Sequence, residues 1–415
     1  MRYFPARVFV SRDNFTNNCA RIKQLVDNKV EVMAIVKANA YGHGLLECTM
    51  RCLENGINWF GVAKISEAFK LHKLLKRQEQ LTGLDMSNLH IFSWIYGPNA
   101  PFRRIVSAGL VVSVSMLWEI QELANAAKQL KKQAHIHIKV DTGFGRDGFT
   151  LVGDTFSQAL KLIQKFESQG LLKCEGIWSH LAHADQVEQG EAVAKTFQQH
   201  AHFEYYTGVI VADAGLNPIY KHIAASAAML NYPEMHYNMV RPGILLYGVS
   251  PNPDTIDMQK LGFRPAMRLD VQMNNVKLVE KGSGISYGHE YTTQNRTNIA
   301  IVPLGYADGI MRSFGGTKTT AGAPVLVEGK VVHIVGRVCM DQFMLDLGRK
   351  TTAKAGDWAT LFGSSIQLDS EKDDRTLSNA GPTVGVEVGS WAEAAGTIPY
   401  EVLTCTTVNA TRKWI

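Results

Sequence analysis

The chain has 415 residues, of which 46% are hydrophobic and 20% are charged. That balance is typical of a globular protein and excludes a disordered, collagen-like or membrane-spanning chain. The net charge of +5 is spread along the sequence, whereas a nucleic-acid-binding protein usually gathers its basic residues on one face. We therefore expect no nucleic-acid partner.

Six cysteines in a chain of this length do not make the disulfide framework of a small secreted domain. Cys48 and Cys52 lie four residues apart, but no second pair follows at the spacing of a zinc site, so no metal is expected. Residues 1–15 lack the apolar segment of a secretion signal. No apolar run reaches the length of about 18 residues that a membrane span needs. The sequence thus predicts a cytoplasmic protein with free thiols and no membrane partner.

Short apolar runs alternate with segments of helical periodicity between residue 30 and about residue 247. In the helical segments, such as ISEAFKLHKLLK, apolar residues recur at positions i, i+3, i+4 and i+7. Strands that alternate with such helices form right-handed βαβ units and a parallel sheet. Eight units in roughly 220 residues predict an α/β fold with a closed (β/α)8 barrel, the TIM barrel, and a doubly wound open sheet is the alternative. The eight apolar runs cover residues 30–36, 59–63, 89–95, 110–115, 134–140, 174–180, 220–226 and 237–248.

The composition changes after residue 248, where β-branched runs are separated by turn clusters and no long helix intervenes. This pattern predicts a mostly-β C-terminal domain with antiparallel strands. A surface excursion is expected at 364–386, and a helical turn at 390–395 is expected to precede a strand at TIPYEVL (397–403). The predicted organisation is a barrel over 11–250, a β domain over 251–415, and an N-terminal segment, 1–10, that packs with the β domain.

Five polar residues stand at or near the ends of predicted barrel strands: Lys37, Lys139, His180, Ser226 and Arg241. The active site of such a barrel lies at this rim, so their common placement suggests a phosphate-bearing cofactor held covalently by an amine. Lys37 ends a fully apolar strand, where a desolvated amine with a lowered pKa becomes a nucleophile. Each residue alone has a structural alternative. Lys37 could be a solvated cap, His180 a packed core histidine, Ser226 a helix N-cap, and Gly243 an ordinary turn residue.

Seven motifs resemble, in order and spacing, those of the bacterial alanine racemases. They are VKANAYGHG (36–44), KVDTGFGR (139–146), SHLAHAD (179–185), RPGILLYG (241–248), GSGISYGHEYT (282–292), PLGYADG (303–309) and GRVCMDQ (336–342). The resemblance covers the chain from about residue 30 to residue 403. It implies a pyridoxal-phosphate-dependent racemase with alanine as its substrate, which supplies D-alanine for peptidoglycan or uses it in catabolism.

The resemblance also implies roles for individual residues. Pyridoxal 5'-phosphate would be joined covalently to Lys37, and the further residues that match cofactor-binding positions are Tyr41, His180, Ser226, Arg241, Gly243, Ile244 and Tyr400. Arg146 and the backbone of Met340 match groups that hold the substrate carboxylate. Lys139 matches a lysine that is often carbamylated in the family, where the carbamate positions the neighbouring arginine. The residues that match the substrate entrance are Asp185, Tyr306, Arg312, Arg337 and Ile398.

Racemisation removes the Cα proton on one face of a planar centre and returns one on the other, so it needs two bases. The resemblance assigns these roles to Lys37 and Tyr287. Tyrosine has an ordinary pKa of about 10 and needs nearby cations to act near neutrality; Arg146 and His180 are the candidates. Arg241 at the pyridine nitrogen would keep that nitrogen unprotonated and suppress transamination. Because Lys37 and Tyr287 belong to different domains, the resemblance implies a homodimer with active sites shared between subunits.

The sequence leaves two alternative functions open. A broader amino-acid or serine racemase of the same fold is harder to exclude than a basic amino-acid decarboxylase, because Arg241 argues against a decarboxylase. A non-catalytic pyridoxal-phosphate-binding protein of similar fold would lack the β domain that carries Tyr287 and Met340. Asp147 is a departure, since the family more often has an apolar residue after the arginine at this position.

Overall fold

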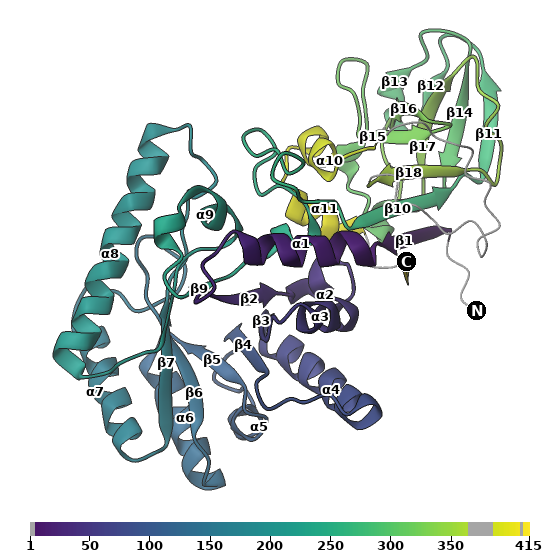
Figure 1. Ribbon diagram of the computed structural model, residues 1–415. Coiled ribbons are helices and arrows are strands. Elements are labelled where there is room, and N and C mark those ends of the chain that lie inside the picture. Colours follow the sequence, from purple (N-terminus) through teal and green to yellow (C-terminus); the bar gives the residue numbers. More distant parts are fainter. Residues whose placement is uncertain (1–4, 364–384, 407–409) are drawn as a thin grey trace.

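The computed structural model describes residues 5–363, 385–406 and 410–415. A barrel surrounded by helices forms one part, and a mostly β part lies beside it (Figure 1). The surface excursion expected at 364–386 lies outside the described residues except for its last two positions, where Val386 pairs with Gly363. Among the described residues, no helix is long and apolar enough to cross a membrane.

The eight predicted strands of the barrel are present and run parallel, in the order β8-β7-β6-β5-β4-β3-β2-β9. The first and last strands meet through a parallel bridge between Ala225 and Arg241, so the barrel is nearly closed and the open-sheet alternative is wrong. The strands are β2 (Glu31–Ile35), β3 (Trp59–Lys64), β4 (His90–Ile95), β5 (Val111–Val114), β6 (Ala134–Lys139), β7 (Leu172–Trp178), β8 (Tyr220–His222) and β9 (Met239–Val240).

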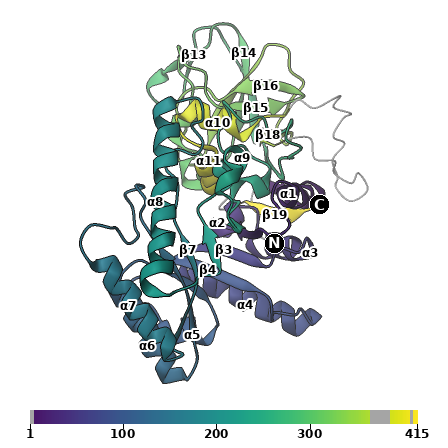
Figure 2. The same cartoon turned by 60° about the vertical axis from the view of Figure 1, so that its left-hand side comes forward.

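Helices cover the outside of the barrel because each buries one apolar face against the strands. In α7 (Thr155–Ser168), for example, Phe156, Leu160 and Ile163 are buried at helical spacing. Figure 2 shows α6 (Leu117–Leu130), α7 and α8 (Gly190–Ala214) along one side of the barrel. The other helices of this part are α1 (Arg12–Gln24), α2 (Lys37–Tyr41), α3 (Leu45–Glu54), α4 (Ile65–Thr82), α5 (Phe102–Ser107) and α9 (Ser226–Asn231).

The second part contains three sheets. The largest has the order β16-β15-β18-β10-β1-β19, so the N-terminal strand β1 (Ala6–Val10) lies between β10 (Met267–Gln272) and β19 (Thr411–Trp414). The other sheets are β11-β14-β17 and β12-β13. The remaining strands are β11 (Asn275–Val279), β12 (Gly284–Ile285), β13 (Tyr291–Thr292), β14 (Thr297–Val302), β15 (Pro324–Val327), β16 (Lys330–His333), β17 (Phe343–Gly348) and β18 (Trp358–Phe362).

One secondary-structure prediction is wrong. TIPYEVL was expected to return to a strand, but it contributes most of its residues to helix α11 (Pro399–Thr406), which follows α10 (Val388–Ala395). Proline is well suited to the start of a helix, where its missing N–H costs no hydrogen bond. Val402, Leu403 and Thr406 are buried, at spacings that fit one face of a helix.

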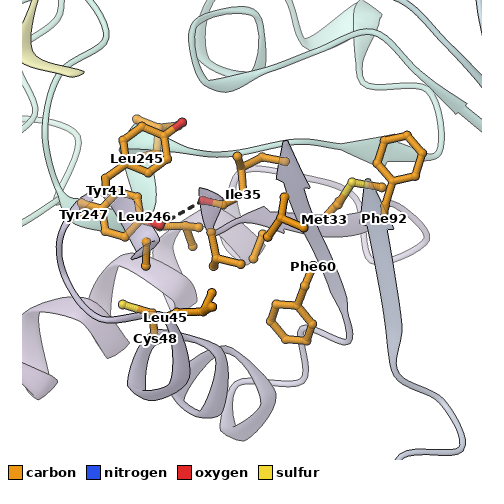
Figure 3. Packing of buried hydrophobic residues seen from close by; sticks show 14 of the residues in the cluster. Met33, Ile35, Tyr41, Leu45, Cys48, Phe60, Phe92, Leu245, Leu246 and Tyr247 are labelled. Atoms are coloured by element: carbon orange, nitrogen blue, oxygen red, sulfur yellow. Dashed lines mark hydrogen bonds between the residues drawn. The ribbon is translucent and has the colours of Figure 1, made fainter. Parts of the chain in front are cut away.

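A continuous hydrophobic core joins the two parts. Figure 3 shows some of its buried residues on the barrel side. Tyr247, fully buried after the last barrel strand, donates a hydrogen bond of 2.9 Å from its hydroxyl to the carbonyl of Ile35. Its ring packs 4.9 Å from the ring of Tyr41 and 6.0 Å from that of Phe15. Phe15 also contacts Trp414 of β19 at 5.9 Å. This packing holds the C-terminal rim of β2 against the second part.

Candidate active site

A cavity of about 630 Å³ opens at the C-terminal ends of the barrel strands. Its apolar wall includes Ile35, Phe92, Trp94, Trp178 and Leu181. Eleven of the residues predicted for the site line it: Lys37, Tyr41, Arg146, His180, Asp185, Ser226, Arg241, Gly243, Ile244, Ile398 and Tyr400. The barrel topology therefore gathers side chains that are separated by up to 363 positions in the sequence.

Lys37 and Tyr41 reach the cavity from an unusual turn. Ala38, Asn39, Ala40 and Tyr41 have φ angles of 52°, 56°, 55° and 49°, so the short helix α2 is left-handed after Lys37. This conformation costs about 1–2 kcal/mol for each L-residue. Such strain persists only where the surrounding structure holds it, and it is concentrated at functional sites.

The Lys37 amine lies in an environment that favours its neutral form. Burial is the main cause that lowers the pKa of Lys37, and the charge of Arg146 lowers it further, whereas Glu67 acts in the opposite direction. The amine also lies 5.8 Å from the ring centre of Trp94. A lysine with a lowered pKa presents a larger fraction of free amine, the form that acts as nucleophile and base.

Hydroxyl groups and a close backbone approach come together at one end of the cavity. A Cβ atom at Gly243 would lie 2.7 Å from the hydroxyl oxygen of Tyr41, so only glycine leaves this hydroxyl room beside the backbone. Ser226 is the first residue of α9 and not its N-cap, and its hydroxyl accepts a 2.9 Å hydrogen bond from the Gly243 N–H. Burial raises the pKa of both Tyr41 and Tyr400, whose rings lie 5.9 Å apart. Both hydroxyls therefore stay protonated and can donate hydrogen bonds.

A buried chain of hydrogen bonds supports Arg241. Its Nη1 donates to His222 Nδ1 at 2.9 Å and to the His222 carbonyl at 2.8 Å, and its Nη2 donates to the Ser179 carbonyl at 2.7 Å. Because a guanidinium can only donate, Nδ1 of His222 must accept. His222 Nε2 then carries the proton and donates to Nδ1 of His137, 2.9 Å away. Arg241 thereby determines the tautomers of two histidines in the barrel.

The positive charge in this region resides on Arg241, because the neighbouring histidines are neutral. Burial lowers the pKa of Arg241 to about 9, which still leaves it cationic at neutral pH. Burial also lowers the pKa of His137 to about 3 and that of His180 and His222 well below the ordinary value. The guanidinium lies 5.0 Å from the ring centre of Trp178. The arginine is thus a fixed donor among neutral rings.

Lys139 lies in a recess beside the cavity, together with Arg146, Asp147 and His180. Its Nζ is 2.5 Å from Oδ1 of Asp147 in an ion pair. Burial lowers the pKa of Lys139, and Asp147 opposes this effect. The Lys139 amine also lies 4.6 Å from the ring centre of Trp178.

Besides Lys139 in its recess, five of the predicted residues do not line the cavity of their own chain. They belong to the β part, and Tyr287 and Met340 are 70% and 53% exposed. Tyr287 lines a second hollow with Ser286, Cys339 and its other neighbours. Tyr306 and Arg312 lie on the surface, and Arg337 forms an ion pair with Glu290.

Several residues of the barrel interior that belong to the site were not predicted from the sequence. Trp94 and Trp178 form walls of the cavity, and His137 and His222 support Arg241 from below. A signal existed, because polar residues at alternate positions of an otherwise apolar strand point to one face. His137 stands two positions before Lys139 in such a strand.

A (β/α)8 barrel with a partly buried lysine, a fixed arginine and several hydroxyl groups at the strand ends is typical of the class of enzymes that bind a phosphorylated cofactor there. Comparison with known proteins identifies the family within this class. Residues 10–251 match the family model described as alanine racemase, N-terminal domain. Residues 266–414 match the model of the C-terminal domain. The chain belongs to the alanine racemase family.

Individual relatives are similar to this chain over nearly its full length. An alanine racemase of Beutenbergia cavernae is 40% identical over 404 residues, which cover 97% of this chain and 95% of the relative. The crystal structure of alanine racemase from D-cycloserine-producing Streptomyces lavendulae has a TM-score of 0.85 and 33% identity, covering 100% of this chain and 98% of that chain. Alanine racemase from Streptomyces coelicolor A3(2) also has a TM-score of 0.85, with 35% identity, covering 99% and 98% of the two chains. The resemblance noted in the motifs is confirmed.

Proposed function

We propose that this chain interconverts L-alanine and D-alanine with pyridoxal 5'-phosphate, the cofactor on which its family depends. The observation that carries the proposal is the cavity in which the partly buried Lys37 side chain and the fixed Arg241 guanidinium lie with the cradle formed by Tyr41, Ser226 and Gly243. When bound, the cofactor supplies an electron sink that makes the Cα proton of an amino acid acidic.

The cavity residues fit such a cofactor. The protonated hydroxyls of Tyr41 and Tyr400, with the close backbone approach that Gly243 permits, suit a phosphate group. Arg241 suits the ring nitrogen, because a guanidinium donates hydrogen bonds and cannot accept them. With Arg241 as a donor there, the nitrogen would stay unprotonated, which would favour return of the proton to Cα. Lys37 supplies the amine for the covalent link.

Lys37 and Tyr287 are the proposed bases. Lys37 moves the proton on one face of Cα, and Tyr287 moves it on the other. Tyr287 is 70% exposed and does not line the cavity of its own chain. We therefore propose a homodimer in which Tyr287 of each subunit completes the site of the other. Met340, with Tyr306, Arg312 and Arg337 at the entrance, would join the site in the same way.

Arg146 is proposed to bind the substrate carboxylate, and Asp185 and Ile398 are proposed to line the entrance. The resemblance predicts carbamylation of Lys139, but we propose instead that this lysine stays a free amine, because it forms an ion pair with Asp147. A carbamate on this nitrogen would bring a second anion next to the Asp147 carboxylate. We propose that the D-alanine produced serves peptidoglycan synthesis.

The test is incubation of the protein with L-alanine and pyridoxal phosphate in D2O, followed by chiral chromatography with mass detection. D-alanine that carries deuterium at Cα is the expected product, with L-serine and L-lysine as competing substrates run in parallel. Faster turnover of serine would keep the two-base mechanism and change the substrate. No D-product from protein with visibly bound cofactor would overturn the proposal.

Mixing two inactive variants tests the shared site. Lys37→Ala and Tyr287→Phe should each lose L-to-D conversion when they are measured alone. Hybrid dimers formed from the two variants contain one site with both native bases, so activity should reappear after mixing and subunit exchange. If each site instead took both bases from one chain, the mixture would stay inactive.

A further inference from the structure

The left-handed turn that carries Lys37 is held from two sides. On its far side, Nδ1 of His43 lies 3.1 Å from the carbonyl oxygen of Ala40 and 3.0 Å from that of Tyr41, and it donates its proton to them. His43 belongs to the same loop as the turn. On the near side, the N–H of Ala38 donates to Oε1 of Glu67 at 2.6 Å. Glu67 comes from α4, in the following βα unit of the barrel.

The carboxylate of Glu67 joins two elements. Its other oxygen, Oε2, accepts a 2.9 Å hydrogen bond from the N–H of Lys64, the residue that caps the start of α4. The N–H group that donates to Oε1 belongs to the peptide group between Lys37 and Ala38. This contact therefore fixes the plane of the peptide next to Lys37, and with it the direction in which the lysine side chain leaves the backbone.

A second capping glutamate shows what is unusual about Glu67. Glu119 has the same position in helix α6, and its Oε2 accepts the N–H groups of Ser115 and Met116, at 2.5 Å and 2.9 Å. Both of those donors lie in the loop that leads into α6. Glu67 caps its helix with one oxygen and uses the other for a donor 29 residues earlier in the sequence. The ordinary requirements of a helix N-terminus do not explain that second contact.

We propose that Glu67 is a positioning residue for Lys37, whose carboxylate ties the left-handed turn to α4 and so aims the lysine amine into the cavity. The inference rests on the proposed racemase activity. Glu67 does not line the cavity, so it acts through the backbone of Ala38 and not on the substrate. Its charge also acts on Lys37 in the sense opposite to burial and Arg146.

The decisive variant is Glu67→Gln. Glutamine keeps the size of the side chain and one acceptor oxygen, but its amide NH2 cannot accept the second N–H. We expect kcat to fall about tenfold while KM for alanine changes less than twofold, because a displaced base slows proton transfer without removing the carboxylate site. Glu119→Gln is the matched control: it makes the same carboxylate-to-amide change at the same helix position, but one amide oxygen can still accept both of its N–H groups, so kcat should stay within about twofold.

Hydrogen exchange provides a readout that does not depend on activity. In the wild-type holoenzyme the Ala38 amide should exchange slowly, and Glu67→Gln should speed its exchange at least tenfold while Glu119→Gln leaves it unchanged. Equal kcat in both variants, or an Ala38 amide unaffected by Glu67→Gln, would overturn the positioning role. If the wild-type protein failed to racemise alanine, the proposed function would fall, and the exchange measurement would still decide whether Glu67 tethers the turn.

Discussion

Acid should destabilise this protein through histidines that are buried in the neutral form, and His43 allows the effect to be measured at one position. His43 is completely buried under the ring of Tyr247, at 4.4 Å between ring centres. Burial lowers its pKa to about 3, against the ordinary value of about 6.5. Between these values the unfolded chain binds a proton that the folded chain does not bind. Stability is therefore complete above pH 6.5 and is lost as the pH falls towards 3.

The magnitude follows from linkage between proton binding and folding. At pH 5, a histidine with a pKa of about 6.5 in the unfolded chain and about 3 in the folded protein reduces the free energy of unfolding by about 2 kcal/mol. This figure changes little for any folded-state pKa below about 4, because the folded protein then binds almost no proton at pH 5. His137 has a pKa of about 3 as well and should contribute a similar loss.

The assay is denaturant unfolding at pH 7 and pH 5, at one protein concentration, for the wild type and His43→Asn. Asparagine can still donate to the carbonyls of Ala40 and Tyr41, but it does not titrate. The variant should lose about 2 kcal/mol less than the wild type between the two pH values, whatever its stability at pH 7. If His43→Asn and the wild type lost the same free energy, burial of neutral His43 would not be the cause.

Three further changes follow from the same structure. Gly243→Ala would place a Cβ 2.7 Å from the Tyr41 hydroxyl, so binding of pyridoxal phosphate, followed by absorbance titration, should weaken by about tenfold or more; unchanged affinity would refute the cradle. Lys139 should take up no carbon-13 label from bicarbonate in NMR spectra, whereas Asp147→Ala should allow uptake by removing the anion at 2.5 Å; a labelled wild type would contradict this. Gly248 has a φ of 70°, and a Cβ atom there would lie 1.8 Å from a backbone carbonyl oxygen. Gly248→Ala should therefore lower the unfolding free energy by more than about 2 kcal/mol in chemical denaturation at fixed pH; an unchanged unfolding free energy would contradict this.

The barrel could be predicted from local pattern because strands and helices of a βαβ unit differ in period. Each of the eight apolar runs contains or overlaps a parallel strand, as those at β2 and β6 show. TIPYEVL could not be assigned in the same way, since a short apolar run fits a strand and a helix equally well. Its helical form depends on Pro399 at the start and on burial against the core.

Of the candidate site, too, one part could be predicted from the sequence and another could not. That Lys37, His180, Ser226 and Arg241 would meet could be predicted, because the C-terminal ends of barrel strands lie on one rim. Their protonation states could not, since the low pKa of His180, like that of the His222 ring behind Arg241, depends on burial and on partners remote in the sequence. The left-handed turn after Lys37 could not be predicted either, because alanine and asparagine do not favour positive φ angles at several consecutive positions.

The sequence by itself determined the order of strands and helices, the rim on which the polar residues gather and, through its motifs, the family. These properties depend on residue spacing and chemical type, which a linear chain already contains. Only the tertiary structure decided the direction of the Lys37 amine, the tautomers behind Arg241, the pairing of Lys139 with Asp147 and the exposure of Tyr287. Each of these depends on distances of a few ångströms between distant segments, and electrostatic and hydrogen-bond energies change steeply over such distances.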